Sequence, residues 1–163
     1  MINAIVKEIY EALDQGLDMV ALMSALALPD ICGKAEYPEL KSKERYAKWF
    51  DTFVGDYERD QEDIRTNMPY PSGEVIFDLR CALLHEGNPT VNKEKQNLVS
   101  FKLLKTKDMM HGGASSVDSN GENRTLEIAI YNLCWKICRL AEWHYNNSKD
   151  KYKFNYIVDD WGK

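Results

Sequence analysis

Arg80 and His85 are the pair of residues in this chain whose types and spacing could do chemistry together. Both lie in a stretch that is predicted to be helical. Five positions of α-helix separate two residues by about 140° around the axis and roughly 7.5 Å along it, a gap that an arginine side chain can bridge. A histidine near a helix C-terminus favours its protonated form, so His85 could act as a general acid. Arg80 could hold a phosphate and neutralise the charge that develops on it.

The same pair also allows a purely structural interpretation. His85 could only hydrogen-bond the end of its helix, and Arg80 could only pair with an acidic neighbour. An arginine followed five positions later by a histidine occurs often by chance. Spacing alone therefore favours the structural interpretation.

The helix that must position the pair is expected between Ser72 and Pro89. Ser72 can cap its start, Glu74 puts a carboxylate in its first turn, and Gly87 before the proline gives a stop signal. Turned at the helical period, the stretch shows two apolar faces, made of Val75, Ile76, Leu79, Ala82 and Leu83, and of Phe77, Cys81 and Leu84. A surface helix needs only one apolar stripe. We therefore expect either a central helix or a helix that meets a second chain.

The rest of the apolar pattern is mostly helical. Residues 2–14 and 131–147 repeat apolar side chains at helical spacing, and residues 42–54 do so with an aromatic face. Residues 17–28 are apolar almost all round, which is typical of a fully buried helix. The segment from Pro29 to Pro38 is expected to be an ordered turn.

Two segments have the alternation of half-buried strands. Residues 98–104 and 125–130 place apolar side chains at every second position, and we expect them to pair. The glycine-rich residues 105–124 between them indicate a mobile functional loop or disorder, and residues 149–163 are expected to dock as a tail. The prediction is a single domain over residues 1–163, mainly α, built as a helical bundle of about five helices with a small β-hairpin.

Composition excludes several classes of protein. The chain has 163 residues, a net charge of −5 and 44% hydrophobic residues, which indicates a globular domain rather than a disordered chain. The negative charge argues against a surface covered with nucleic-acid-binding residues, although it allows a local site. No apolar run is long enough for a transmembrane helix, so the expected location is cytoplasmic, with the four cysteines reduced.

The run Leu79-Arg80-Cys81-Ala82-Leu83-Leu84-His85 resembles the R-x4-6-H motif of HEPN domains (higher eukaryotes and prokaryotes nucleotide-binding). The wider run, with LALPDICG near residues 26–33, is similar to a group of uncharacterised bacterial and prophage proteins. The resemblance implies an all-helical, commonly dimeric bundle. It also implies a composite, metal-independent ribonuclease site made by the motif's arginine and histidine from two chains, as in toxin–antitoxin and phage-defence systems.

Zinc binding is the alternative that the cysteines offer. Cys134 and Cys138 are one helical turn apart, and Cys32 and Cys81 could complete a tetrahedron. Cysteine is also among the most buried residue types, so we expect core thiols and no metal. The chain has no P-loop, Rossmann, G-x-S-x-G or H-E-x-x-H pattern, and no cofactor is expected.

Three functions remain open on this basis. The first is a HEPN-like ribonuclease that acts on RNA through Arg80 and His85 in a homodimer formed by the helix at residues 73–86. The second is a non-catalytic HEPN-like binding or structural module. The third is an unrelated helical protein in which the motif is accidental. The first two would suit an antitoxin or another operon partner, and none requires a membrane.

Overall fold

The computed structural model describes residues 1–55, 71–86, 100–108, 113–117 and 124–153. Within them lie the helices α1 (Ile2–Asp14), α2 (Asp18–Ala25), α3 (Leu28–Glu36), α4 (Ser42–Phe53), α6 (Gly73–Cys81) and α7 (Ile130–Asn147). A π-helical turn, η2 (Ala82–Glu86), extends α6, and a 3-10 turn, η3 (Lys149–Lys151), follows α7. The strands are β1 (Ser100–Leu104), β2 (Gly113–Val117) and β3 (Arg124–Ala129). The predicted mainly α fold with a small β element is confirmed.

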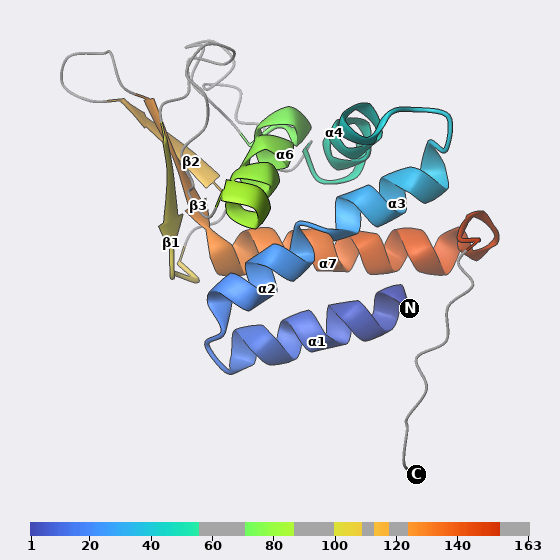
Figure 1. Ribbon diagram of the computed structural model, residues 1–163. Coiled ribbons are helices and arrows are strands. Elements are labelled where there is room, and N and C mark those ends of the chain that lie inside the picture. The colour runs from blue at the N-terminus through green and yellow to red at the C-terminus, as the bar shows by residue number, and fades with distance from the viewer. Residues whose placement is uncertain (56–70, 87–99, 109–112, 118–123, 154–163) are drawn as a thin grey trace.

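The long helix α7 is the element on which the others assemble. It packs against α1, α2 and α3, while α4 packs between α3 and α6. Figure 1 shows α7 running through the middle of the molecule, with the sheet at its N-terminal end and α4 and α6 on the opposite side from α1. The predicted apolar face of α7 forms much of the core, because Leu133, Cys134, Ile137, Cys138 and Ala141 are fully buried.

The aromatic face predicted for residues 42–54 is also in the core. Trp49, Tyr46 and Phe50 are the largest fully buried side chains. The Tyr46 hydroxyl donates a hydrogen bond to the carbonyl of Leu26 at 3.0 Å, which satisfies the one polar group of a buried ring. Helix α4 thereby holds the end of α2 as well as its neighbours α3 and α6.

The segment after Pro29 is a helix, and the prediction of a turn there is wrong. α3 begins at Leu28, with the proline in its first turn, where a missing backbone N–H costs nothing. Gly33 lies where α3 approaches α4 closely, since a Cβ at that position would be 2.7 Å from the carbonyl oxygen of Arg45. The proline that was expected to stop one helix therefore starts the next.

The helix predicted at residues 17–28 is shorter than expected and not fully buried. α2 ends at Ala25, and Leu17, Met19 and Val20 are 50%, 39% and 57% exposed. Ala21, Leu22 and Ala25 form its buried side. α2 thus lies at the surface with apolar residues on both of its sides.

The sheet has the strand order β1–β3–β2. The two predicted strands do pair, with Phe101 opposite Leu126 and Leu103 opposite Ile128, but they run parallel and so do not form a hairpin with each other. β2 pairs antiparallel with β3 and lies inside the segment expected to be a loop or disordered. Because the chain reverses once into β2 and once out of it, β1 and β3 must point the same way.

The C-terminal segment is described only in part. Residues 154–163 of the predicted tail lie outside the described residues, while Tyr152 just before them packs against His144 and Tyr145. Within the described ranges, no helix combines the length and the apolar character needed to cross a membrane.

Candidate functional site

Helix α6 carries the predicted site, and its start is fastened to α4. The Ser72 hydroxyl accepts a hydrogen bond from the backbone N–H of Val75 at 3.4 Å, which confirms the predicted cap. The backbone N–H of Gly73 donates to a carboxylate oxygen of Asp51 on α4 at 2.7 Å. Two side chains thus satisfy two of the first N–H groups of α6, which have no partner within the helix.

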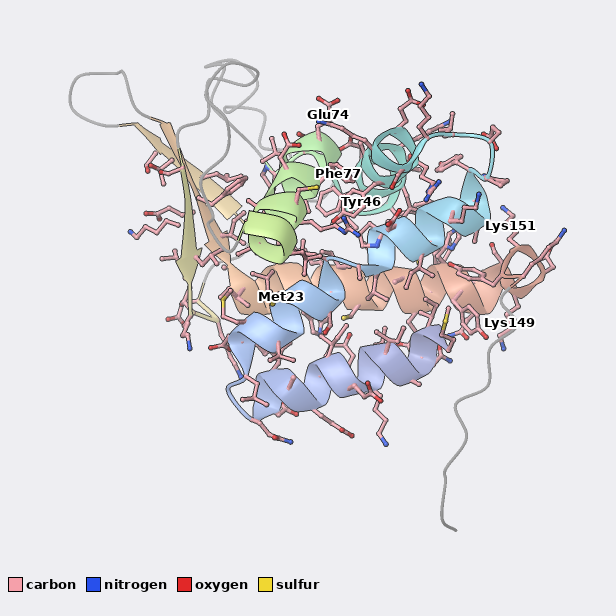
Figure 2. All side chains as sticks on the ribbon, viewed as in Figure 1. Met23, Tyr46, Glu74, Phe77, Lys149 and Lys151 are labelled. Atoms are coloured by element: carbon pink, nitrogen blue, oxygen red, sulfur yellow. The ribbon has the colours of Figure 1, made fainter. Side chains whose placement is uncertain are left out.

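The two apolar faces of this helix have different environments. Val75, Ile76, Leu79, Ala82 and Leu83 are buried, as predicted. On the other face, the Phe77 ring lies edge-on to Tyr46 at 5.2 Å between centroids, and Figure 2 shows both rings where α6 meets α4. Leu84 at the end of that face is 39% exposed. The second face is therefore covered by α4 in its first turns and open at its C-terminal end.

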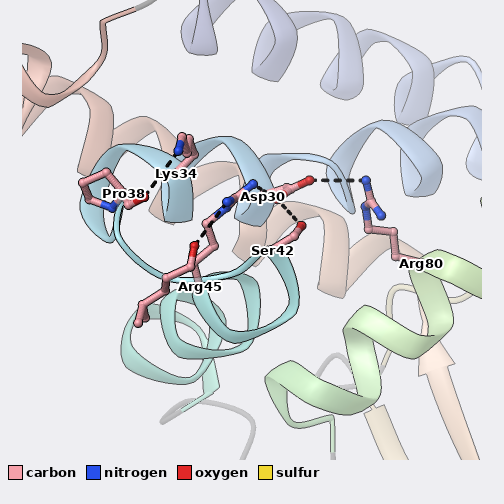
Figure 3. Close-up of polar contacts among 7 residues, drawn as sticks. Asp30, Lys34, Pro38, Ser42, Arg45 and Arg80 are labelled. Carbon is pink, nitrogen blue, oxygen red and sulfur yellow. Dashed lines mark hydrogen bonds and ion pairs between the residues drawn. The ribbon is translucent and has the colours of Figure 1, made fainter.

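Arg80 lies in a partly buried polar cluster with residues of α3 and α4 (Figure 3). Its guanidinium is 3.4 Å from one carboxylate oxygen of Asp30, and the guanidinium of Arg45 is 3.4 Å from the other. The Ser42 hydroxyl donates to Asp30 as well, at 3.2 Å. The ring of Phe77 lies 5.9 Å from the Arg80 guanidinium carbon. One carboxylate thus binds two arginines and ties three helices together.

Both arginines keep a buried nitrogen without a partner. The Nε atoms of Arg45 and Arg80 make no hydrogen bond within the described part of the chain. A buried N–H without an acceptor is costly, and such groups in folded proteins call for an explanation. Arg80, the arginine of the predicted motif, therefore has a buried N–H group without an acceptor in the described part of the chain.

The backbone between Arg80 and His85 departs from an α-helix. Residues Ala82–Glu86 form the π-helical turn, so the geometry expected for a regular α-helix does not apply. A π-turn closes its hydrogen bonds over five residues, so positions five apart lie closer around the axis than the α-helical 140°. Such turns are rare and occur frequently at functional sites. The His85 side chain itself lies outside the described part of the structure.

The basic residues of α4 are engaged with neighbouring side chains. Lys43 pairs with Asp78 of α6 at 3.2 Å, and Lys48 lies 4.3 Å from the centre of the Tyr37 ring. Arg45 belongs to the Asp30 cluster. These cations therefore hold α3, α4 and α6 together at the surface.

All four cysteines are free thiols. Cys32, Cys134 and Cys138 are buried, and Cys81 is partly exposed. Burial raises the pKa of the Cys32 thiol to about 12 and that of Cys138 to about 12. Among the described residues, no three histidine, cysteine, aspartate or glutamate side chains could hold a metal ion together. The zinc tetrahedron considered from the sequence is therefore not formed.

A second polar cluster surrounds His144, at the far end of α7 from the sheet. His144 is 2% exposed and is hydrogen-bonded to a Glu36 carboxylate oxygen at 3.0 Å and to the Tyr152 hydroxyl. Lys151, labelled in Figure 2, contacts the same oxygen of Glu36 at 2.6 Å. His144 is therefore a core histidine whose two ring nitrogens are both hydrogen-bonded.

Acid is expected to weaken the fold through this cluster. Burial lowers the pKa of His144, so the unfolded chain binds more protons than the folded one as pH falls below about 6.5. The free energy of unfolding should therefore fall between about pH 7.5 and about pH 5.5, a window above the titration of Glu36, whose pKa its hydrogen bond with Lys151 lowers further. Urea unfolding at both values tests this. The His144→Gln protein should show a smaller difference, and an equal one would contradict the assignment.

The outer side of α7 carries an aromatic and basic ridge that was not predicted. Tyr131, Trp135, Arg139 and Trp143 follow one another at intervals of four and define the α7 ridge. Trp135 and Trp143 are 40% and 55% exposed. Only the buried stripe of this helix was extracted from the sequence, and the four-residue spacing was the signal that could have revealed the ridge.

Comparison of the chain with protein-family models, with curated proteins and with solved structures gives no match. The candidate sites must therefore be judged by their own residues and geometry.

Proposed function

We propose that this protein is a HEPN-like, metal-independent endoribonuclease whose composite site is formed by Arg80 and His85 from two copies of the chain. The observation that carries the proposal is the π-helical turn at Ala82–Glu86, which begins two residues after Arg80 and contains His85. A π-turn winds fewer degrees per residue than an α-helix, which would bring positions 80 and 85 toward one side of the helix, where both could address one phosphate.

The proposed chemistry uses a proton transfer and a fixed positive charge. The imidazole of His85 takes the proton from a ribose 2′-hydroxyl or gives one to the leaving oxygen, while Arg80 neutralises the charge on the phosphate. Neither step requires a divalent ion. A cytoplasmic toxin or phage-defence protein, controlled by an antitoxin or another operon partner, is the setting in which such an activity would be used.

A test of this proposal incubates the wild-type protein with single-stranded RNA in EDTA. Cleavage should persist in the chelator, and the products should end in a 2′,3′-cyclic phosphate, because attack by the 2′-hydroxyl leaves that end. Complete protection of the RNA by EDTA would contradict the mechanism. So would products that carry only 5′-phosphates, because those arise from attack by water.

A specific observation favours the second candidate, a non-catalytic HEPN-like binding or structural module. Arg80 already has a carboxylate partner in Asp30, and its side chain is only 18% exposed. If this ion pair is its whole role, the protein forms a stable assembly and cuts no RNA.

A homodimer seam at the open end of α6 is part of both proposals. Leu84 is 39% exposed next to the partly buried Cys81, and a second copy of the helix could cover both. Leu84→Asp places a charge in that seam and should convert a dimer to a monomer on a sizing column with light scattering, because an unpaired charge is costly to bury. Val20→Asp, which changes an exposed residue of α2, is the control and should leave the assembly unchanged. A wild-type protein that is monomeric at high concentration would contradict the seam.

A further inference from the structure

The α7 ridge exposes two tryptophans that the core does not use. α7 already buries its opposite side through Leu133, Cys134, Ile137 and Cys138. Isolated exposed apolar residues are ordinary, but adjoining ones that line a hollow indicate a binding surface. The α7 ridge therefore has the features of a binding surface.

The shape of the surface fits planar ligands in a row. A hollow of about 490 Å³ lies over α7 and the end of α4, lined by Phe53, Trp135, Arg139 and Trp143 among others. A second hollow is lined by Tyr131, Asn132, Trp135 and Lys136. Trp135 and Lys136 line both, so the two hollows are neighbours on the same helix. From Tyr131 to Trp143 the helix rises about 18 Å, so the surface is an elongated track.

The rings of this track are held in place before any ligand binds. Phe53 is 6.3 Å from Trp143 and is itself packed against Trp49 at 5.3 Å, which links the outer tryptophan to the core. The guanidinium of Arg139 lies 5.1 Å from the centre of the Trp135 ring. A base that stacks here thus meets rings whose positions are already restricted, which lowers the entropic cost of binding.

The charges along the track are positive although the chain as a whole is negative. Arg139 and Lys136 lie on it, and Lys107 is 4.3 Å from the centre of the Tyr131 ring. Glu142 is the single acidic residue in α7, and its charge helps to raise the pKa of Tyr10 on α1. Cations interleaved with exposed aromatic rings match a ligand that carries both phosphates and planar bases.

We propose that the α7 ridge binds single-stranded RNA, with bases stacked on Trp135 and Trp143 and phosphates contacted by Arg139 and Lys136. The choice of RNA rests on the proposed ribonuclease function. The ridge would hold the strand while the motif on α6 cuts it, and in the non-catalytic case it would be the binding site itself.

Binding of a fluorescently labelled single-stranded RNA is measured by polarisation, in the His85→Ala background so that the strand stays intact. Trp135→Ala and Trp143→Ala should each weaken binding by about 5- to 150-fold, the equivalent of losing one stacked base. Arg139→Ala should weaken it too and reduce the salt dependence by about one phosphate contact. Trp143→Phe should retain most of the affinity, because a ring remains for stacking.

The matched control is Lys7→Ala, which removes one positive charge from an exposed side chain on α1 and should change the affinity by less than about twofold.

Unchanged affinity in both tryptophan variants would overturn the proposal. Equal affinity for single-stranded DNA would overturn the choice of RNA. A dimer lost in Trp143→Ala, with RNA binding retained, would assign the ridge to self-association instead. If the wild-type protein cuts no RNA but the ridge variants lose RNA binding, the proposed ribonuclease function is refuted and the RNA-binding role of the α7 ridge is supported. If RNA is cleaved equally fast by the wild-type protein and by the ridge variants, the ribonuclease function is supported and the RNA-binding role of the α7 ridge is refuted.

Discussion

Replacing Gly73 with alanine is expected to lower the free energy of unfolding by about 3 kcal/mol or more, at the upper end of what overpacking costs. A Cβ at this position would lie 2.3 Å from the carbonyl oxygen of Ala47 and 2.5 Å from its Cα. Both contacts are with backbone atoms, so no side chain can rotate away to relieve them. The helix would have to move off α4, which would also break the hydrogen bond from the Gly73 N–H to Asp51.

Gly16→Ala is the matched control for this effect. Gly16 has φ +73°, and no atom lies within 4 Å of a Cβ built on it. Its replacement should therefore cost only the backbone strain of a left-handed residue, about 1–2 kcal/mol. Urea unfolding of the two variants should rank Gly73→Ala as the less stable. A Gly73→Ala protein as stable as the wild type would contradict the close packing of α6 on α4.

Replacing His85 with alanine is expected to lower RNA cleavage by ~10²–10⁴-fold, the usual contribution of a general acid or base. Arg80→Ala should cause a loss of similar size, and the double variant should lose little more, because both side chains act on one phosphate. His85→Ala should unfold within a few degrees of the wild type. Single-turnover cleavage and thermal unfolding of the same samples measure both quantities.

The ion pair with Asp30 makes it possible to separate the two roles of Arg80. Asp30→Asn removes the charge that Arg80 pairs with but keeps the arginine. If Arg80 acts on RNA, Asp30→Asn should lose stability and keep cleavage, whereas Arg80→Ala should lose both. If Arg80 is only structural, the two variants should lose stability alike with no difference in RNA cleavage. Full cleavage by the His85→Ala protein would refute the catalytic assignment outright.

The sequence by itself determined several of the local elements. The predicted bounds of residues 2–14 and 131–147 agree with α1 and α7 to within a residue, and the aromatic face of residues 42–54 is buried as expected. The Ser72 cap was predicted as well. Helical periodicity and capping act over a few neighbouring residues, so the sequence displays them directly.

Only the tertiary structure decided which segments meet. Arg80 was recognisable as a functional candidate, but its partner Asp30 is 50 positions away, in a segment that was expected to be a turn. The same holds for the direction of β1 against β3 and for the exposure of Leu17, Met19 and Val20. The physical reason is that an apolar pattern in the sequence shows which face of a helix or strand can be buried. Which neighbour covers that face depends on how all the helices pack. The α7 ridge is exposed because, in the described structure, only the end of α4 reaches it, and no local sequence pattern indicates that.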